Sequence, residues 1–395
     1  MERESSLRSP SLGKGVFIVV YMALKTLYLR ESGTIQLADA FLILVTAYLM
    51  LSGRGKFPAD RGSRRYLGLF LALCFYLTLI NTIWSLITGY NQLRYSLYYI
   101  FNLIATFDFL VIGRDIGLEK LNKSIIQGAF YSLLISTFGL ILAFGGARAV
   151  GFFNNPNQLG YSGLLMFTFI LLCGENTRKG KKVFMIAMAV WAVVASSSKA
   201  AVIGIISAAM LFVIFGKQRR SLKTIVLTLL GLACAVFVIY LIFYSNNKVI
   251  TSNYAVSLLR RRMRNIASES DSNLGSGRGY ERIREIGVNV LWGVGEGANS
   301  RFITLSQKEV HSTYASLFVS YGLIGFVGFM ILFGMAVVSR KETIRNLALC
   351  SGVLLYQMAH NGIRNTVVWL LLAVLLLQKA ENEKTRDVPL YPLLL

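Results

Sequence analysis

The sequence has few charged residues, cysteines and histidines. Charged residues make up 15% of its 395 positions, whereas a soluble domain usually carries about 25%. Few water-soluble folds could bury so much apolar surface, so the composition excludes an ordinary soluble domain. The four cysteines, Cys74, Cys173, Cys234 and Cys350, all lie inside apolar runs. We therefore predict buried thiols rather than disulfide bonds.

The apolar residues, which are 55% of the chain, gather into long runs. Such runs are typical of helices that cross a bilayer, which takes about 20 residues. We predict an all-α fold, a polytopic membrane helix bundle with about twelve transmembrane helices, which forms a single integral membrane domain over residues 1–395. The predicted spans are Gly15–Leu29, Ile35–Leu51, Tyr66–Ile87, Leu93–Ile112, Ser124–Gly145, Gln158–Cys173, Val183–Ala195, Ala200–Phe215, Thr224–Tyr244, Ser312–Val338, Leu347–His360 and Thr366–Leu377.

The net charge of +22 has two candidate explanations, nucleic-acid binding and basic cytoplasmic loops. Every second short loop is basic, and the loops between them are nearly free of lysine and arginine. The basic loops hold Arg54, Lys56, Arg61, Arg64 and Arg65, then Arg114, Lys120 and Lys123, then Arg178, Lys179, Lys181 and Lys182, then Lys217, Arg219, Arg220 and Lys223, and lastly Arg340, Lys341 and Arg345. This alternation predicts a multi-pass protein of the cytoplasmic (inner) membrane, with both termini in the cytoplasm and no nucleic-acid partner.

One loop on the predicted outer side is much longer than the others. It covers residues 245–311, between the ninth and tenth predicted spans, and is rich in glycine, serine and asparagine. Two of its segments, Tyr254–Ala267 and Arg278–Trp292, have apolar residues at helical spacing. We predict that the first is a helix on the membrane surface and that the second is a helix with an arginine-bearing face.

The predicted topology gathers both histidines and several cations on the outer side. They are Arg148, Lys199, Arg278, Arg282, Arg284, His311, His360 and Arg364, accompanied by Asn157 and Asn361. Cations on that side oppose the positive-inside tendency and so call for a reason. Arginine binds phosphate oxygens bidentately, lysine supplies a point charge, and histidine accepts a proton near neutral pH. The set therefore suits transfer from a phosphate leaving group to a hydroxyl, without the ligand spacing of a metal site.

Each of these residues also has a purely structural explanation. The asparagines around Pro156 could cap the span that follows. Lys199 could be an interfacial anchor, and the arginines of the long loop could form a solvated face. The functional interpretation rests on the whole group lying on one side of the membrane.

Four segments of the chain resemble the O-antigen polymerase and O-antigen ligase superfamily of polytopic membrane glycosyltransferases. Arg148–Gly160 is similar to the family's Gly-x-x-x-Asn-Pro-Asn-x-x-Gly segment, and Ser197–Ala201 to its Ser-Arg-small segment. Arg278–Gly297 resembles an arginine-led helix followed by Gly-x-Gly-x-Gly. Val310–Gly325 is similar to His-Asn-x-Tyr with a downstream Gly-hydrophobic-hydrophobic-Gly. This chain differs in having Lys199 in place of arginine, Ser312 in place of asparagine, and no glutamate around Ser320.

The resemblance implies a glycosyltransferase that acts outside the cytoplasmic membrane, on a glycan linked to undecaprenyl pyrophosphate. His311 would be the general base, and Arg278 would stabilise the departing pyrophosphate. The implied substrate- and pyrophosphate-binding residues are Lys199, Arg148, Arg282, Asn157 and Arg284. The resemblance implies no cofactor and no metal, and it makes a chain-length regulator a further candidate partner.

Several functions remain open on the sequence. A polymerase would pass the growing glycan to another lipid-linked repeat unit, whereas a ligase would pass it to a lipopolysaccharide core. We favour the polymerase, because the departures from the family pattern lie around the acceptor-side motifs. A polysaccharide transporter would place ionisable residues along the middle of the bundle. Charges inside the membrane are few, namely Lys25, Asp39 and Asp108, so transport ranks lower. A non-enzymatic scaffold ranks lowest, because it has no need to gather both histidines and several arginines on one side.

Overall fold

The computed structural model describes residues 12–31, 33–55, 58, 60–142, 149–216, 257, 280–297 and 309–384. Every regular element within these ranges is a helix. The elements are α1 (Leu12–Leu24), α2 (Leu37–Leu51), α3 (Arg61–Thr88), α4 (Leu93–Ile116), α5 (Leu118–Leu142), α6 (Pro156–Cys173), α7 (Lys179–Ser196), α8 (Lys199–Phe215), α12 (Arg282–Glu285), the 3-10 helix η2 (Gly287–Val290), α13 (Thr313–Val337), α14 (Thr343–Ala359) and α15 (Thr366–Lys384).

Eleven of the twelve predicted spans coincide with described helices, and the ninth, Thr224–Tyr244, lies outside the described residues. Polar residues set several of the boundaries. The Asp60 carboxylate accepts a hydrogen bond from the Ser63 backbone N–H at 2.7 Å and caps the start of α3. Asn155 caps α6 in the same way, with Pro156 at the first helical position. Such caps satisfy amides that a helix leaves unpaired at its start.

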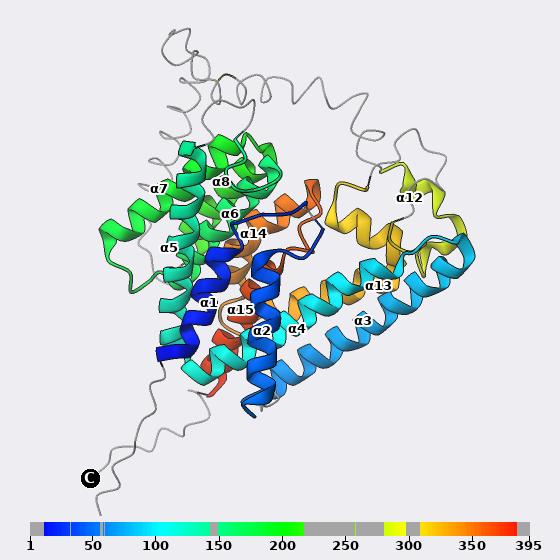
Figure 1. Cartoon of the computed structure of the whole chain (residues 1–395), viewed down its shortest axis with the longest axis horizontal. Coiled ribbons are helices and arrows are strands. Elements are labelled where there is room, and N and C mark those ends of the chain that lie inside the picture. The colour runs from blue at the N-terminus through cyan, green and yellow to red at the C-terminus, as the bar shows by residue number, and fades with distance from the viewer. Residues whose placement is uncertain are drawn as a thin grey trace, which may run out of the picture.

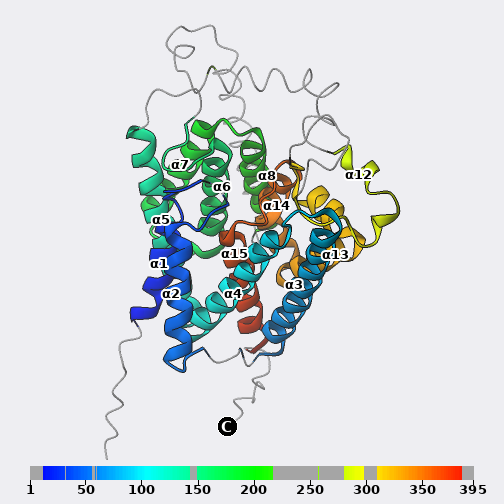
Figure 2. The same cartoon turned by 45° about the vertical axis from the view of Figure 1, so that its right-hand side comes forward.

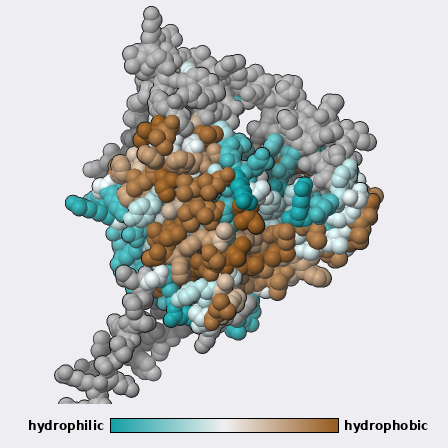
Figure 3. Space-filling view, viewed as in Figure 1, coloured by the Kyte–Doolittle hydropathy of each residue, from teal (hydrophilic) through white to brown (hydrophobic). Residues whose placement is uncertain are grey.

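Four of the described helices, α3, α4, α5 and α13, are long and apolar enough to cross a bilayer. The apolar parts of α1, α2 and α8 are shorter. These helices support a helical membrane protein, whereas the number of about twelve spans stays a prediction. The apolar face seen in Figure 3 fits this assignment, and exposed side chains such as Leu71, Phe75 and Ile141 belong to these long helices.

Helix α15 lies in the interior of the bundle. Its residues from Val367 to Leu376 are all buried, whereas a helix on the outside of a bundle buries only one stripe. It packs against α4 and α13, while α8 packs against α14, α6 against α7 and α1 against α5. Figure 2 shows α15 behind α4, between the group of α5 to α8 and the group of α3 and α13. The three described cysteines are buried and free, as predicted.

The bundle has two ends of different character, which we name the basic end and the site end. At the basic end, α1 begins and α4 ends, and Lys14 pairs there with Asp115. The end of α15 meets the end of α13 on this side, where Lys379 Nζ donates to the Val338 carbonyl at 2.9 Å. At the site end, α3 ends beside η2, and α13 begins beside the turn between α14 and α15. Among the described residues, those of the predicted basic loops and those of the predicted outer cluster thus lie at opposite ends.

The prediction of one helix over Arg278–Trp292 is wrong for its described part. A short α12 is followed by the 3-10 helix η2, and Gly287, with φ of 52°, breaks the regular backbone between them. The other helix predicted in the long loop, Tyr254–Ala267, falls outside the described residues except for Ser257. Figure 1 shows α12 at one side of the molecule, next to α13.

Candidate active site

The site end is built on a break in α13. Gly322 has φ of 64° and ψ of −166°, so the helix loses its regular hydrogen bonds there. The carbonyls of Val319 and Ser320 accept hydrogen bonds instead from the backbone N–H groups of Val294 and Gly295, at 3.0 and 2.8 Å. The glycine-rich segment 293–297 is therefore attached to α13 by its backbone, which satisfies groups that the break would leave unpaired.

Gly295 is required by this close approach. Its φ is 73°, and a Cβ atom added there would lie 2.1 Å from the Gln92 side-chain oxygen and 2.9 Å from Cβ of Trp84. A residue with a side chain would face both backbone strain and a collision. The Gly-x-Gly-x-Gly pattern thus has a structural reason, which is to let the loop pass close to α3 and α4.

This loop places the carboxylate of Glu296 in the interior, where it is only 2% exposed. One carboxylate oxygen accepts a hydrogen bond from the Tyr321 hydroxyl at 2.5 Å. The other accepts from Nε of Arg364 at 3.1 Å and also pairs with Nη2 of the same guanidinium. The Glu296 backbone N–H donates to the Asn81 side-chain oxygen at 2.9 Å. Both carboxylate oxygens and the backbone N–H of Glu296 therefore have hydrogen-bond partners, as the burial of a charged residue requires.

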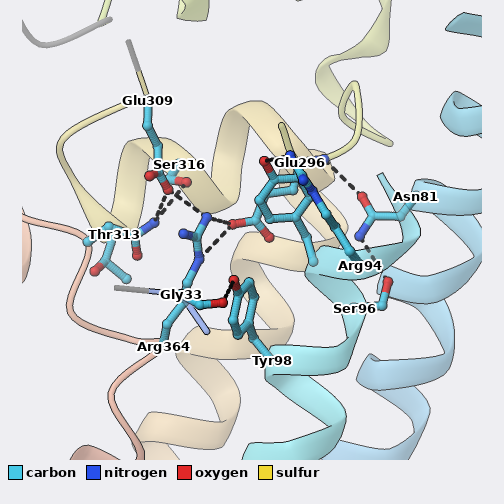
Figure 4. Close-up of polar contacts among 12 residues, drawn as sticks. Gly33, Asn81, Arg94, Ser96, Tyr98, Glu296, Glu309, Thr313, Ser316 and Arg364 are labelled. Atoms are coloured by element: carbon cyan, nitrogen blue, oxygen red, sulfur yellow. Dashed lines mark hydrogen bonds and ion pairs between the residues drawn. The ribbon is translucent and has the colours of Figure 1, made fainter. Parts of the chain in front are cut away.

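Arg364 lies between two carboxylates, as Figure 4 shows. Its Nη2 is 2.5 Å from Oε1 of Glu309, in addition to the contact with Glu296. The guanidinium also lies over the rings of Tyr95 and Tyr98, at 5.5 and 5.3 Å from their centroids. Burial alone would lower the pKa of Arg364, but the two carboxylates raise the pKa well above its usual value. We name Glu296, Arg364 and Glu309 the carboxylate–arginine cluster.

Arg282, a predicted pyrophosphate ligand, also reaches this region. Its residue is 1% exposed and lines a small pocket together with Glu296, Glu309, Ser316 and Ser320. Burial lowers the pKa of the Arg282 guanidinium, and the carboxylates of Glu285 and Glu309 oppose that change. The pocket therefore combines a buried guanidinium with carboxylates and hydroxyl groups in one small volume.

His311, the predicted general base, lies at the rim of the same region. It is exposed and stands two residues after Glu309, immediately before α13 begins. The next residue, Ser312, caps α13, since its hydroxyl accepts from the Ala315 backbone N–H at 3.4 Å. Asparagine is an equally good capping residue, so the departure from the family's His-Asn pattern preserves this structural role.

The turn between α14 and α15 holds the start of α13 in place. The Thr313 hydroxyl donates to the His360 carbonyl at 3.1 Å and accepts from the Gly362 backbone N–H at 3.0 Å. The Asn361 side-chain nitrogen donates to Glu309 at 3.1 Å. His360 is thus positioned through its backbone, while its ring lies 4.8 Å from the ring of Tyr356.

Asn157 and Lys199 belong to a neighbouring part of the site end. The backbone carbonyl of Asn157 accepts a hydrogen bond from the Tyr356 hydroxyl at 2.9 Å, which joins the start of α6 to α14. Lys199 is half-buried at the start of α8, after Ser197, whose φ of 52° is left-handed. A non-glycine residue in that conformation is strained, and such strain often marks functional positions.

The remaining predicted site residues divide into two groups. Arg284 is exposed on α12, two residues from the buried Arg282. Arg148 and Arg278 lie outside the described residues. Among the described candidates, the structure brings Arg282 and the segment leading to His311 together around the pocket. Asn157 and Lys199 are attached to this region through α14 and α6.

Sequence reasoning missed the two carboxylates. Glu296 was noted only as part of a glycine-rich motif, and Glu309 was not singled out. The whole chain has only 19 acidic residues. An acidic residue close to predicted phosphate-binding residues is therefore unusual, and this signal could have pointed to Glu296 and Glu309. Arg364 was counted among the cations available on the outer side, but Glu296 and Glu309 neutralise it. Among the described residues, Arg282 is the buried cation that lines the pocket.

Comparison with known protein families identifies a match over residues 183–330, to a family described as O-antigen ligase. A comparison with curated proteins finds no match. The matched region extends from α7 into α13 and contains Lys199, Arg282 and His311. It confirms the resemblance to the O-antigen polymerase and ligase superfamily and, with the apolar helices, indicates a membrane protein.

Proposed function

Because residues 183–330 carry an O-antigen ligase family domain, we propose that this protein is a membrane glycosyltransferase whose donor is a glycan on undecaprenyl pyrophosphate. We propose further that it polymerises lipid-linked repeat units into a surface polysaccharide, at the outer face of the cytoplasmic membrane. The observation that carries the proposal is the small pocket lined by Val310, the residue before His311, together with the buried Arg282, Glu309 and two serines.

The reaction assigns a separate task to each residue. A sugar hydroxyl of the acceptor attacks the anomeric carbon of the donor, and its proton goes to the His311 imidazole. A new glycosidic bond forms as the bond from the anomeric carbon to the pyrophosphate oxygen breaks, and the lipid pyrophosphate leaves with the electron pair. Arg282, Lys199 and the arginines at 148, 278 and 284 stabilise the charge on that leaving group. Asn157 contributes to the same binding region.

The carboxylate–arginine cluster supports this chemistry without taking part in it. Arg364 holds Glu309 in place, and the backbone continues from Glu309 through His311 to the capped start of α13. A general base must lie within hydrogen-bonding reach of the proton that it accepts, so its backbone needs a fixed position. Arg364, which follows α14, helps to fix that position by binding Glu309.

Ligation is the closest competing function, since a ligase would use the same donor and leaving group. Transport is the competing function from a different class. Three of the charges inside the predicted spans contact other residues of the bundle, since Lys25 pairs with Asp39 at 2.7 Å and one carboxylate oxygen of Asp108 accepts from Thr46 at 2.5 Å. Groups that are paired in this way favour a structural role over a substrate path through the bundle.

The test is an assay of the purified full-length chain in liposomes. Lipid-linked repeat units are supplied alone and then together with a lipopolysaccharide core, and the products are separated by length. A ladder from repeat units alone identifies a polymerase, and product only in the presence of core identifies a ligase. Absence of product under both conditions from folded protein would contradict glycosyl transfer and favour transport.

His311→Ala is the first variant to assay. Loss of a general base typically lowers a rate by about 10²–10⁴-fold, and we expect a loss in this range. His360→Phe is the matched control, because it keeps the backbone carbonyl that holds Thr313 and the ring that faces Tyr356. An equal loss in both variants would remove the special role of His311.

A further inference from the structure

A second pocket lies at the basic end, on the opposite side of the bundle from the candidate active site. Its volume is about 490 Å³, within the range of small-molecule sites. Its charged residues are Glu119 and Lys123 of α5, Glu175, Arg178 and Lys181 around the start of α7, and Glu342 and Arg345 at the start of α14, and its amide residues include Asn122 of α5 and Gln378 of α15. The glycosyl transfer proposed above uses none of them.

The charges in this pocket are unevenly matched. The Glu119 carboxylate pairs with Lys123 at 2.7 Å, and the Glu342 carboxylate pairs with Arg345 at 3.0 Å. Within the part of the chain that the structure describes, the side chain of Arg178 pairs with no carboxylate. The Lys181 ammonium lies 4.6 Å from the centre of the Phe130 ring, an uncharged partner. The exposed carboxylate of Glu175 also lines the pocket, so its lining has four cations and three carboxylates, and Arg178 and Lys181 are the two cations outside the pairs of Lys123 and Arg345.

Two further features favour an anion. Helices α7 and α14 both begin at the pocket, and neither has a side-chain cap at its first turn. Uncapped first-turn amides carry partial positive charge and favour negative groups. The amide oxygen of Asn122, which also lines the pocket, is buried and accepts no hydrogen bond among the described residues. It could accept one from a hydroxyl group attached to that anion.

We propose that this pocket binds a phosphate group at the cytoplasmic face of the membrane, with Arg178 and Lys181 as its ligands. Basic pockets between helices at that face are suited to the headgroups of anionic lipids. Arginine holds phosphate oxygens through its planar fork, and lysine adds a mobile point charge. A glycerol headgroup would also bring a hydroxyl to Asn122. The phosphate comes from a lipid such as phosphatidylglycerol or from a free ion, and the experiment distinguishes these two sources.

The experiment measures thermal unfolding of the full-length chain in an uncharged detergent. Phosphatidylglycerol, diacylglycerol and inorganic phosphate are each titrated into the wild type, into Arg178→Gln/Lys181→Gln and into Lys179→Gln/Arg340→Gln. The last variant removes the same charge from exposed residues at the same end that do not line the pocket. Native mass spectrometry of the same samples counts the retained lipid, so binding is measured independently of stability.

We expect phosphatidylglycerol to raise the Tm of the wild type in a saturable way. The pocket variant should lose that shift and the retained lipid, and the control variant should keep both. A saturable shift from inorganic phosphate that depends on the same two residues would identify a free phosphate as the ligand. The proposal is overturned if neither anion shifts the Tm, if diacylglycerol acts equally well, or if the control variant loses as much as the pocket variant.

Discussion

The two ends of the bundle use charge in different ways. At the basic end, the ion pairs are partly or fully exposed, whether they lie one helical turn apart, as Lys123 and Glu119 do, or join two helices, as Lys14 and Asp115 do. At the site end, Arg364 pairs with Glu296, 68 positions earlier, and Glu296 is almost completely buried. Water screens the attraction within the exposed pair, whereas a buried charge strongly destabilises the fold unless its partner is present. Charge at the basic end is therefore exposed to water, whereas the buried ion pair at the site end fixes the geometry of its side chains.

Backbone regularity differs between the ends as well. Helices at the basic end are joined by short turns, as between α4 and α5, where the chain turns at Gly117 alone. At the site end, α13 is interrupted inside its own length and accepts hydrogen bonds from the glycine-rich segment. Buried backbone groups at such a break are tolerated only where other protein groups satisfy their hydrogen bonds. At the site end, the break in α13 thus allows the glycine-rich segment to bind there and to place Glu296 in the interior.

The largest effect that separates the two ends is expected from Arg364→Leu. This change leaves Glu296 buried without its cation, which typically costs about 3–5 kcal/mol. Thermal unfolding in detergent would show a strong fall in Tm. The double change Glu296→Gln/Arg364→Leu removes both charges and should recover much of the loss. A single variant that melts like the wild type would mean that the cluster does not stabilise the site end.

Arg282→Lys is expected to reduce activity with little change in stability. Lysine keeps the charge but loses the bidentate geometry that suits a pyrophosphate, so we expect a rate lower by about 10²-fold. The exposed Arg284 on the same short helix is the matched control, and Arg284→Lys should stay close to the wild type. Equal rates for both variants, measured in the polymerisation assay, would contradict a leaving-group role for the buried arginine.

Gly295→Ala should destabilise the site end by about 1–3 kcal/mol, because strain at a left-handed position adds to a collision with Gln92. Gly287→Ala is a useful comparison, since Gly287 also has a positive φ but open space around its Cβ position. It carries the backbone cost alone and should lower the Tm less. Equal unfolding temperatures for the two variants would show that close packing of the loop against α3 and α4 is unimportant.

The smallest effect is expected at the basic end, from Lys123→Gln. Lys123 and Glu119 are both exposed, so water screens their attraction and the pair contributes little to the free energy of unfolding. The Tm should stay within experimental error of the wild type, at low and at high salt. A clear fall in Tm would mean that the two ends differ less in their use of charge than the structure indicates.

Local sequence signals predicted much of the fold. The apolar runs predicted eleven described helices, and the asparagines around Pro156 indicated one helix start by capping. Each signal involves residues only a few positions apart, so it can be recognised in the sequence without the structure. The helix predicted over Arg278–Trp292 failed because its spacing was helical while Gly287 and the attachment to α13 broke the backbone. A tertiary contact there overrode a local pattern.

The sequence by itself determined that the chain is rich in apolar helices and that its cations alternate between loops, since both follow from composition and order. It also indicated which motifs would meet at one end, through the order of the spans. Only the tertiary structure decided that Arg364 is neutralised by Glu296 and Glu309, and that Arg282 shares a pocket with Glu309. Those contacts join residues from separate helices and loops. Their energies depend on burial and on exact distance, which no pattern along the chain records.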